Sequence, residues 1–204
     1  NATLTFNRSD AITVANAITG TGTLVQNGTG TVTFGNARPV GGTLVQRGTL
    51  RLNGMGTLTG AIAMQPGTSL FVDGWDSLGY DSSPPWVTTV TVNEAIVTME
   101  GGPNQSASTD FILNGGRITG TVNWNLYSGT PANNTASVST LASATTSVID
   151  ANTISFGQQA VTFDVADGAA NPDLRVSSVA SGAGGLVKAG AGLMVLLGNN
   201  TYSG

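Results

Sequence analysis

The sequence predicts an all-β solenoid, a coil of short strands in which each turn packs on the next. Three observations carry this prediction. Apolar residues recur at intervals of about ten along the first third of the chain, turn signals rich in Gly and Asn separate them, and one stretch is repeated near the end. Each coil of a solenoid buries its apolar face on the next coil, so sequence repetition is expected of that fold.

The first strands are predicted by alternation of polar and apolar side chains. Thr3–Phe6, Thr31–Phe34 and Thr49–Leu52 each carry apolar residues at every second position, which is the pattern of a strand with one buried face. The apolar positions keep a spacing of ten and resume it after one slip of two: Leu4, Val14, Leu24, Phe34 and Leu44, then Leu52, Ile62 and Val72. The first third of the chain is therefore predicted to be a series of short strands.

A repeated stretch favours a solenoid over a sandwich or barrel. Residues 20–34 align without a gap on residues 182–196, with Gly, Leu and Val at matching positions. Further strands are expected at 147–149, 153–156, 160–165 and 173–176. We predict a single solenoid segment over residues 1–204, with roughly nine to ten coils and belonging to a longer repeat chain. Two stretches, about 73–88 and 126–136, break the rhythm and are expected to leave the solenoid as loop excursions.

Composition narrows the classes of function. Charged residues make up 9% of the chain, the formal net charge is −4, and histidine and cysteine are absent. With no basic patch, binding to nucleic acid is disfavoured, and no apolar run is long enough for a helix inserted in a membrane. The missing histidine removes the commonest general base and the commonest metal ligand. We therefore expect no enzyme and no organic cofactor.

The end of the chain resembles the autotransporter-associated β-strand repeat. The signature of that family is Gly-x-Gly-x-Leu-x-Lys-x-Gly-x-Gly, then alternating apolar residues, then Gly-x-Asn-Thr-Tyr-x-Gly, and residues 182–204 match each anchor. A weaker copy near residues 20–36 has Gln26 in place of the lysine. The resemblance implies a right-handed parallel β-helix in the passenger region of a secreted or cell-surface bacterial protein. It therefore implies an extracellular or cell-surface location, and no catalytic residue carries over from the repeat.

Three carboxylates fall in the first expected excursion: Asp73, Asp76 and Asp81. Carboxylates clustered on a Gly-rich loop can hold Ca²⁺, although this spacing matches no calcium motif. Asp-Gly pairs such as Asp73-Gly74 are also ordinary turn residues. A structural turn is the favoured interpretation, and a calcium site is the alternative.

Aromatic residues concentrate in the same stretch, at Trp75, Tyr80 and Trp86. Exposed rings beside carboxylates and hydroxyls can stack on a glycan or contact a host protein. They can equally anchor a loop on the solenoid, and anchoring is the favoured interpretation. Trp124 alternates in phase with Val122, so we expect it in the core.

The densest charged group comprises Asp164, Asp167, Asp173 and Arg175. Polysaccharide lyases built on β-helices use clustered Asp with Arg or Lys, so this group is a candidate catalytic set. The first two carboxylates flank an expected turn, and Asp173 can pair with Arg175. Turns and an ion pair are favoured over catalysis.

These patterns favour a structural segment of a stalk or fibre. A solenoid segment exposes an unpaired strand edge at each end, and such edges pair readily. The expected partners are adjacent repeats of the same chain or copies of itself, end to end. An adhesin that binds glycan or a host protein through its aromatic loops is the alternative, and a polysaccharide lyase is a remote one.

Overall fold

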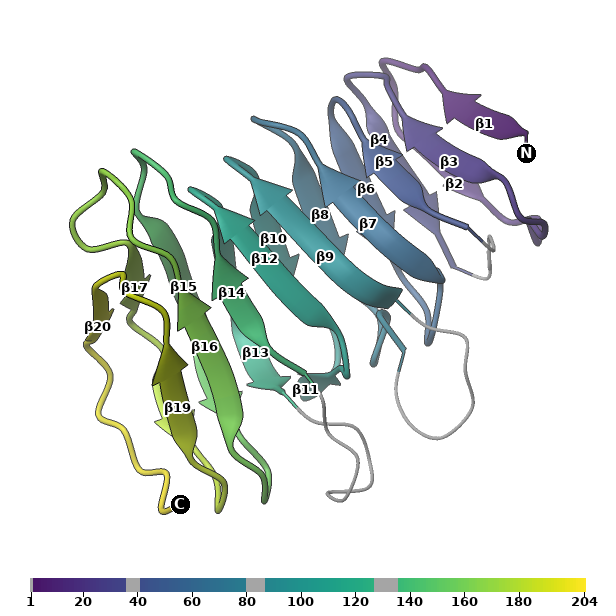
Figure 1. Cartoon of the computed structure of the whole chain (residues 1–204). Helices are drawn as coiled ribbons and strands as arrows, with labels where there is room; N and C mark the ends of the chain where they lie inside the picture. Colours follow the sequence, from purple (N-terminus) through teal and green to yellow (C-terminus); the bar gives the residue numbers. More distant parts are fainter. Residues whose placement is uncertain (1, 36–40, 80–86, 127–135) are drawn as a thin grey trace.

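The chain forms a parallel β-helix in the computed structural model (Figure 1), which describes residues 2–35, 41–79, 87–126 and 136–204. One sheet has nine strands: β1 (Thr3–Phe6), β3 (Thr23–Gln26), β5 (Thr43–Val45), β7 (Gly60–Met64), β9 (Val87–Asn93), β12 (Asp110–Asn114), β14 (Val138–Thr140), β16 (Val161–Val165) and β19 (Leu186–Ala189). The second sheet contains β2 (Ile12–Val14), β4 (Thr31–Phe34), β6 (Thr49–Leu52), β8 (Ser69–Val72), β10 (Ile96–Met99), β13 (Arg117–Asn125), β15 (Ser147–Ser155), β17 (Leu174–Val176) and β20 (Met194–Leu196).

Successive coils stack in register. Each strand pairs in parallel with the strand one coil away, so Leu4 lies beside Leu24 in the first sheet and Val32 beside Leu50 in the second. The all-β fold and the parallel β-helix predicted from the sequence are confirmed, including the alternating strands of the first third. The right-handed sense of the coil stays a prediction.

The core lies between the two sheets, and its inward positions form continuous columns. In the first sheet one column runs through Leu24, Ile62, Val90, Phe111, Val138 and Phe163, all buried. Trp124 is fully buried and packs edge-on against Phe111, with ring centroids 4.9 Å apart, so its predicted core position is confirmed. A buried aromatic pair of this kind contributes about 1 kcal/mol beyond the area it buries.

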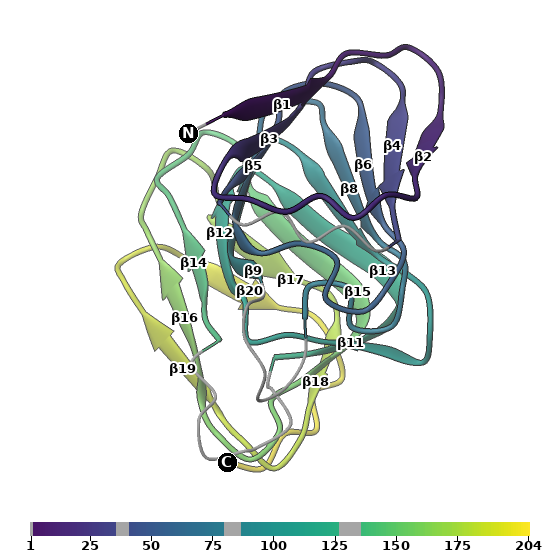
Figure 2. The ribbon, with the colours of Figure 1, turned by 90° about the vertical axis from the view of Figure 1, so that its right-hand side faces the viewer.

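Two short strands form part of a third side in the later coils. β11 (Asn104–Ser106) pairs with the end of β13, and β18 (Val179–Ser181) pairs with the end of β15. Figure 2 views the two sheets nearly end on, with β11 and β18 on the side away from β2. In the earlier coils this side is built from irregular segments, and one of them carries the first group of candidate site residues. The described residues include no helix that is long and apolar enough to cross a membrane.

Candidate functional site

The first half of the expected excursion 73–88 lies against the solenoid. Gly74, Asp76, Ser77 and Leu78 are buried. The backbone N–H groups of Gly56 and Thr57 donate to the carbonyls of Asp76 and Ser77, at 3.1 and 3.0 Å. Residues 73–79 therefore close the third side of their coil. Residues 80–86 lie outside the described part of the chain, as do residues 127–135 of the second expected excursion.

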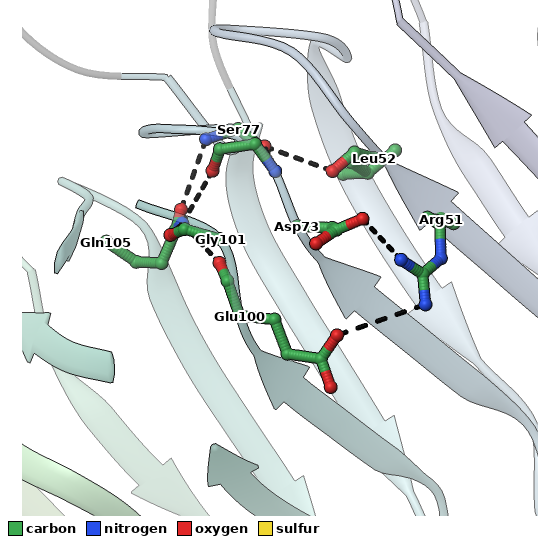
Figure 3. A network of polar contacts seen from close by, with 8 residues as sticks. Arg51, Leu52, Asp73, Ser77, Glu100, Gly101 and Gln105 are labelled. Carbon is green, nitrogen blue, oxygen red and sulfur yellow. Dashed lines mark hydrogen bonds and ion pairs between the residues drawn. The ribbon is translucent and has the colours of Figure 1, made fainter. Parts of the chain in front are cut away.

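A buried polar network holds this segment in place (Figure 3). The Gln105 amide nitrogen donates to the carbonyls of Gly74, Glu100 and Gly101 at 2.5, 2.7 and 2.9 Å, and the amide oxygen accepts from the Ser77 N–H at 3.3 Å. The Ser77 hydroxyl donates to the Leu52 carbonyl at 3.1 Å and accepts from the Gly74 N–H at 2.8 Å. The network satisfies backbone groups that would otherwise be buried without partners.

The side chain of Asp76, in place of a backbone carbonyl, accepts a hydrogen bond from a backbone N–H of the next coil. The residue has φ 46° and is 3% exposed, and its Oδ1 accepts from the Ser106 N–H at 2.6 Å. Burial raises the pKa of the Asp76 carboxyl, while hydrogen bonds from Ser106 and from the Trp75 side chain oppose that shift. The folded protein therefore binds this proton more tightly than the unfolded chain does.

We expect Asp76→Asn to flatten the pH dependence of stability. Because the folded-state pKa is raised, the stability linked to this group is fully present below the unfolded pKa, about 3.9. It is lost as the pH rises from there through the folded pKa. Urea unfolding at several pH values from 3 to 7 measures this slope.

Asp10→Asn is the control for that experiment, because it should have the opposite sign. The hydrogen bond from exposed Arg8 lowers the pKa of Asp10, so any stability from this group is present above the unfolded pKa and lost as the pH falls. A wild-type profile that Asp76→Asn leaves unchanged would contradict the role of Asp76.

The two described carboxylates of the predicted calcium site have separate partners. Asp73 forms an ion pair with Arg51, whose other terminal nitrogen lies 3.9 Å from Glu100. Asp76 is bound to Ser106, and Asp81 lies outside the described residues. Among the residues that the structure describes, no three acidic side chains are placed to hold a metal ion. The calcium site stays a prediction that depends on Asp81.

Trp75 projects from this segment into solvent. Its exposure is 58%, whereas Leu78 is 2% exposed and joins the core. Leu78 thus packs this segment on the core, whereas the Trp75 ring lies mostly outside the core and its side chain hydrogen-bonds to the Asp76 carboxyl. The anchoring role of Trp75 stays a prediction. Tyr80 and Trp86, the other two aromatic candidates, lie outside the described residues.

The four charged residues near the C-terminal end have different surroundings. The buried Asp173 carboxylate accepts from the N–H groups of Gly168 and Leu193, both at 2.8 Å. Arg175 is exposed on β17, and none of the described ion pairs joins it to Asp173, so the expected pair is wrong. Asp164 and Asp167 are exposed. Asp173 therefore fastens the last coil to the preceding one.

The two ends of the solenoid form a second candidate site. Leu4 is 43% exposed, whereas Leu24, its neighbour one coil inward, is 1% exposed. Nine partly buried apolar residues pack on the described core, and eight of them lie in the first or last coil: Phe6, Ile12, Val14, Ile18, Leu186, Met194, Leu196 and Tyr202. A cavity of about 410 Å³, lined by residues 2–4 and 18–24, opens beside the first coil. Both ends thus leave core side chains partly uncovered.

No family model, curated protein or solved structure matches the chain.

Proposed function

We propose that the chain is a structural rod, a segment of a stalk or fibre in a bacterial secreted or cell-surface protein of the autotransporter type. The observation that carries this proposal is the continuous parallel stack of coils, in which two sheets run from one end of the described chain to the other. The ends of this stack also bear on its assembly. Leu4 is 43% exposed at an inward position, and the outer edges of β1 and β19 have no neighbouring strand in the described chain. Soluble proteins normally protect such edges, and solenoids normally end in polar caps. Coils of another copy, stacked on either end, would cover both ends.

The spacing of the inward residues makes the two ends suited to one another. Ile12 follows Leu4 by eight residues, and Met194 follows Leu186 by eight. All four are inward positions that flank the corner between the two sheets. A first coil placed on a last coil would therefore align both strands at once and continue both sheets. Head-to-tail contacts generate filaments when the rotation between copies does not close a ring, and coaxial stacking of coils would be such a contact.

Association of the isolated chain tests the proposal. Negative-stain electron microscopy and small-angle scattering over a concentration series should reveal rods of constant width that lengthen with concentration. Leu4→Lys places a charge on the first inward column and should shorten the rods. Thr5→Lys is the matched control on the outer face of the same strand, where the side chain is already exposed.

Hydrogen exchange gives the outcome that would overturn the proposal. Uncovered end strands should exchange quickly, because local opening there breaks few contacts. The proposal fails if the chain stays monomeric and the amides of β1 and β19 exchange as slowly as those of the central strand β9.

A further inference from the structure

A group of aromatic and charged side chains lies on the outer surface of the third, fourth and fifth coils. It comprises Arg51, Met55, Phe71, Asp73, Trp75 and Glu100, which we call the Trp75 surface. The chain has only 7 Lys and Arg and 11 Asp and Glu in 204 residues. Three of these few charged groups lie near Trp75, the most exposed aromatic residue of the described part of the chain. None of these six side chains takes part in the buried hydrogen-bond network of Gln105.

The charged half of this surface is ordered by an arginine. Arg51 on β6 lies beside Phe71 on β8, with the guanidinium carbon 4.7 Å from the ring centroid. The guanidinium also pairs with Asp73 and lies 3.9 Å from Glu100 (Figure 3). These carboxylates remain partly exposed, at 21% and 36% of their side chains. Their free lone pairs can accept hydrogen bonds from a ligand.

The apolar half is Trp75 with Met55 from the preceding coil. The segments that follow the two residues run side by side, since Gly56 and Thr57 hydrogen-bond to Asp76 and Ser77. Trp75 is 58% exposed and Met55 61%. Gly102 lies next to Trp75, and even an added methyl group there would be 3.7 Å from the Trp75 Cβ. The absence of a side chain at Gly102 leaves this flank of Trp75 uncovered.

The position of Trp75 is fixed before any ligand arrives. Its neighbours Gly74 and Asp76 are buried. The Gly74 N–H donates to the Ser77 hydroxyl, the Gly74 carbonyl accepts from Gln105, and the Asp76 side chain accepts from the Ser106 N–H. An exposed ring on a rigid backbone loses little conformational entropy on binding. Buried polar groups thus hold in place an aromatic residue that contributes little to the core.

We propose that the Trp75 surface binds a neutral polysaccharide. The face of a pyranose ring is apolar and packs on an indole, while its hydroxyls can donate to Asp73 and Glu100 and accept from Arg51. Two carboxylates against one guanidinium leave the surface with a net negative charge, so an acidic polysaccharide would be repelled. This binding site is independent of any contact at the ends of the rod.

Isothermal titration calorimetry with three probes tests the assignment. Cellohexaose and chitohexaose are neutral, and polygalacturonate is the acidic comparison. We expect at least one neutral probe to bind with a Kd of about 1 mM or tighter, and polygalacturonate to bind at least tenfold more weakly. Trp75→Ala should weaken binding at least tenfold with only a small change in the thermal midpoint, since the ring is mostly exposed and its hydrogen bond to Asp76 is lost.

Two further variants complete the test. Leu141→Ala removes an apolar side chain of similar exposure, 48%, away from the Trp75 surface, and should leave binding unchanged. Arg51→Gln should weaken binding of the neutral probe by removing the group that orients both carboxylates. The proposal is overturned if neither neutral probe binds, if polygalacturonate binds as well as they do, or if Trp75→Ala binds like the wild type.

Discussion

Gly101→Ala should destabilise the protein by about 4 kcal/mol, one of the largest effects available to a single methyl group. Gly101 has φ 68°, a left-handed conformation that costs roughly 1–2 kcal/mol for a residue with a Cβ. The added carbon would also overlap the backbone oxygen of Asp73. Relief of that overlap must move either the Gln105 network or the coil that carries Asp73, because the Gly101 carbonyl accepts from Gln105.

Gly67→Ala is the matched control for this substitution. Gly67 has nearly the same backbone conformation, with φ 75°, but an added Cβ there would meet no atom within 4 Å. The control should therefore lose only the conformational energy, about 1 kcal/mol. Urea unfolding measures the loss of stability of both variants, provided that the dependence of the unfolding free energy on urea concentration is unchanged. Equal losses at the two positions would mean that backbone conformation alone accounts for the effect, and the close approach of the two coils would have no energetic weight.

The strands were predictable from the sequence because inward positions obey a simple period. Leu50 and Leu52 alternate with Thr49 and Arg51 on one strand, and the structure buries the first two and leaves the others partly exposed. Because the strands stack in parallel and in register, apolar residues are required again at the paired positions one coil later, Leu70 and Val72. Alternation and repetition thus encode the two sheets and the core between them.

The third side was harder to predict, because polar groups replace apolar ones there. Asp73 to Gly79 has the composition of a loop, yet Asp76 and Ser77 are buried and bound to backbone groups of other coils. Gln105 is a polar residue in a short polar strand, and it lacks any local pattern that marks it as central. Its partners come from residue 74 as well as from residues 100 and 101.

The candidate sites were predictable only where composition alone pointed to them. The concentration of aromatic residues predicts a candidate site at Trp75, and the exposure of this side chain supports a binding role. Met55, Arg51 and Glu100 could not be added from the sequence, because each lies on a different coil from Trp75 and only the register brings them together. Asp173 was assigned to the wrong partner for the same reason, since Leu193 reaches it from the next coil.

Gln105→Leu should cost about 4 kcal/mol, because it keeps the size of the buried side chain and removes its hydrogen bonds. Three carbonyls that share the two N–H groups of the Gln105 amide, and the Ser77 N–H, lose their partner together. Each buried polar group left unsatisfied costs roughly 1–3 kcal/mol, and part of the loss is recovered by burial of the leucine. The effect should be local as well as global, so the Ser77 amide should exchange faster with solvent than in the wild type.

Gln26→Leu provides the matched comparison, since Gln26 is also fully buried. Its amide nitrogen donates to two carbonyls, of Gly28 and Gly30, at 2.9 and 3.1 Å, and its amide oxygen is buried without a partner among the described residues. Loss of Gln26 leaves fewer groups unsatisfied and removes one that was already unsatisfied, so its cost should be about half that of Gln105→Leu. Urea unfolding of both variants measures the difference. If Gln26→Leu costs as much, the energy lies in packing around a buried side chain, and the network that holds Trp75 would be no stronger than an ordinary core contact.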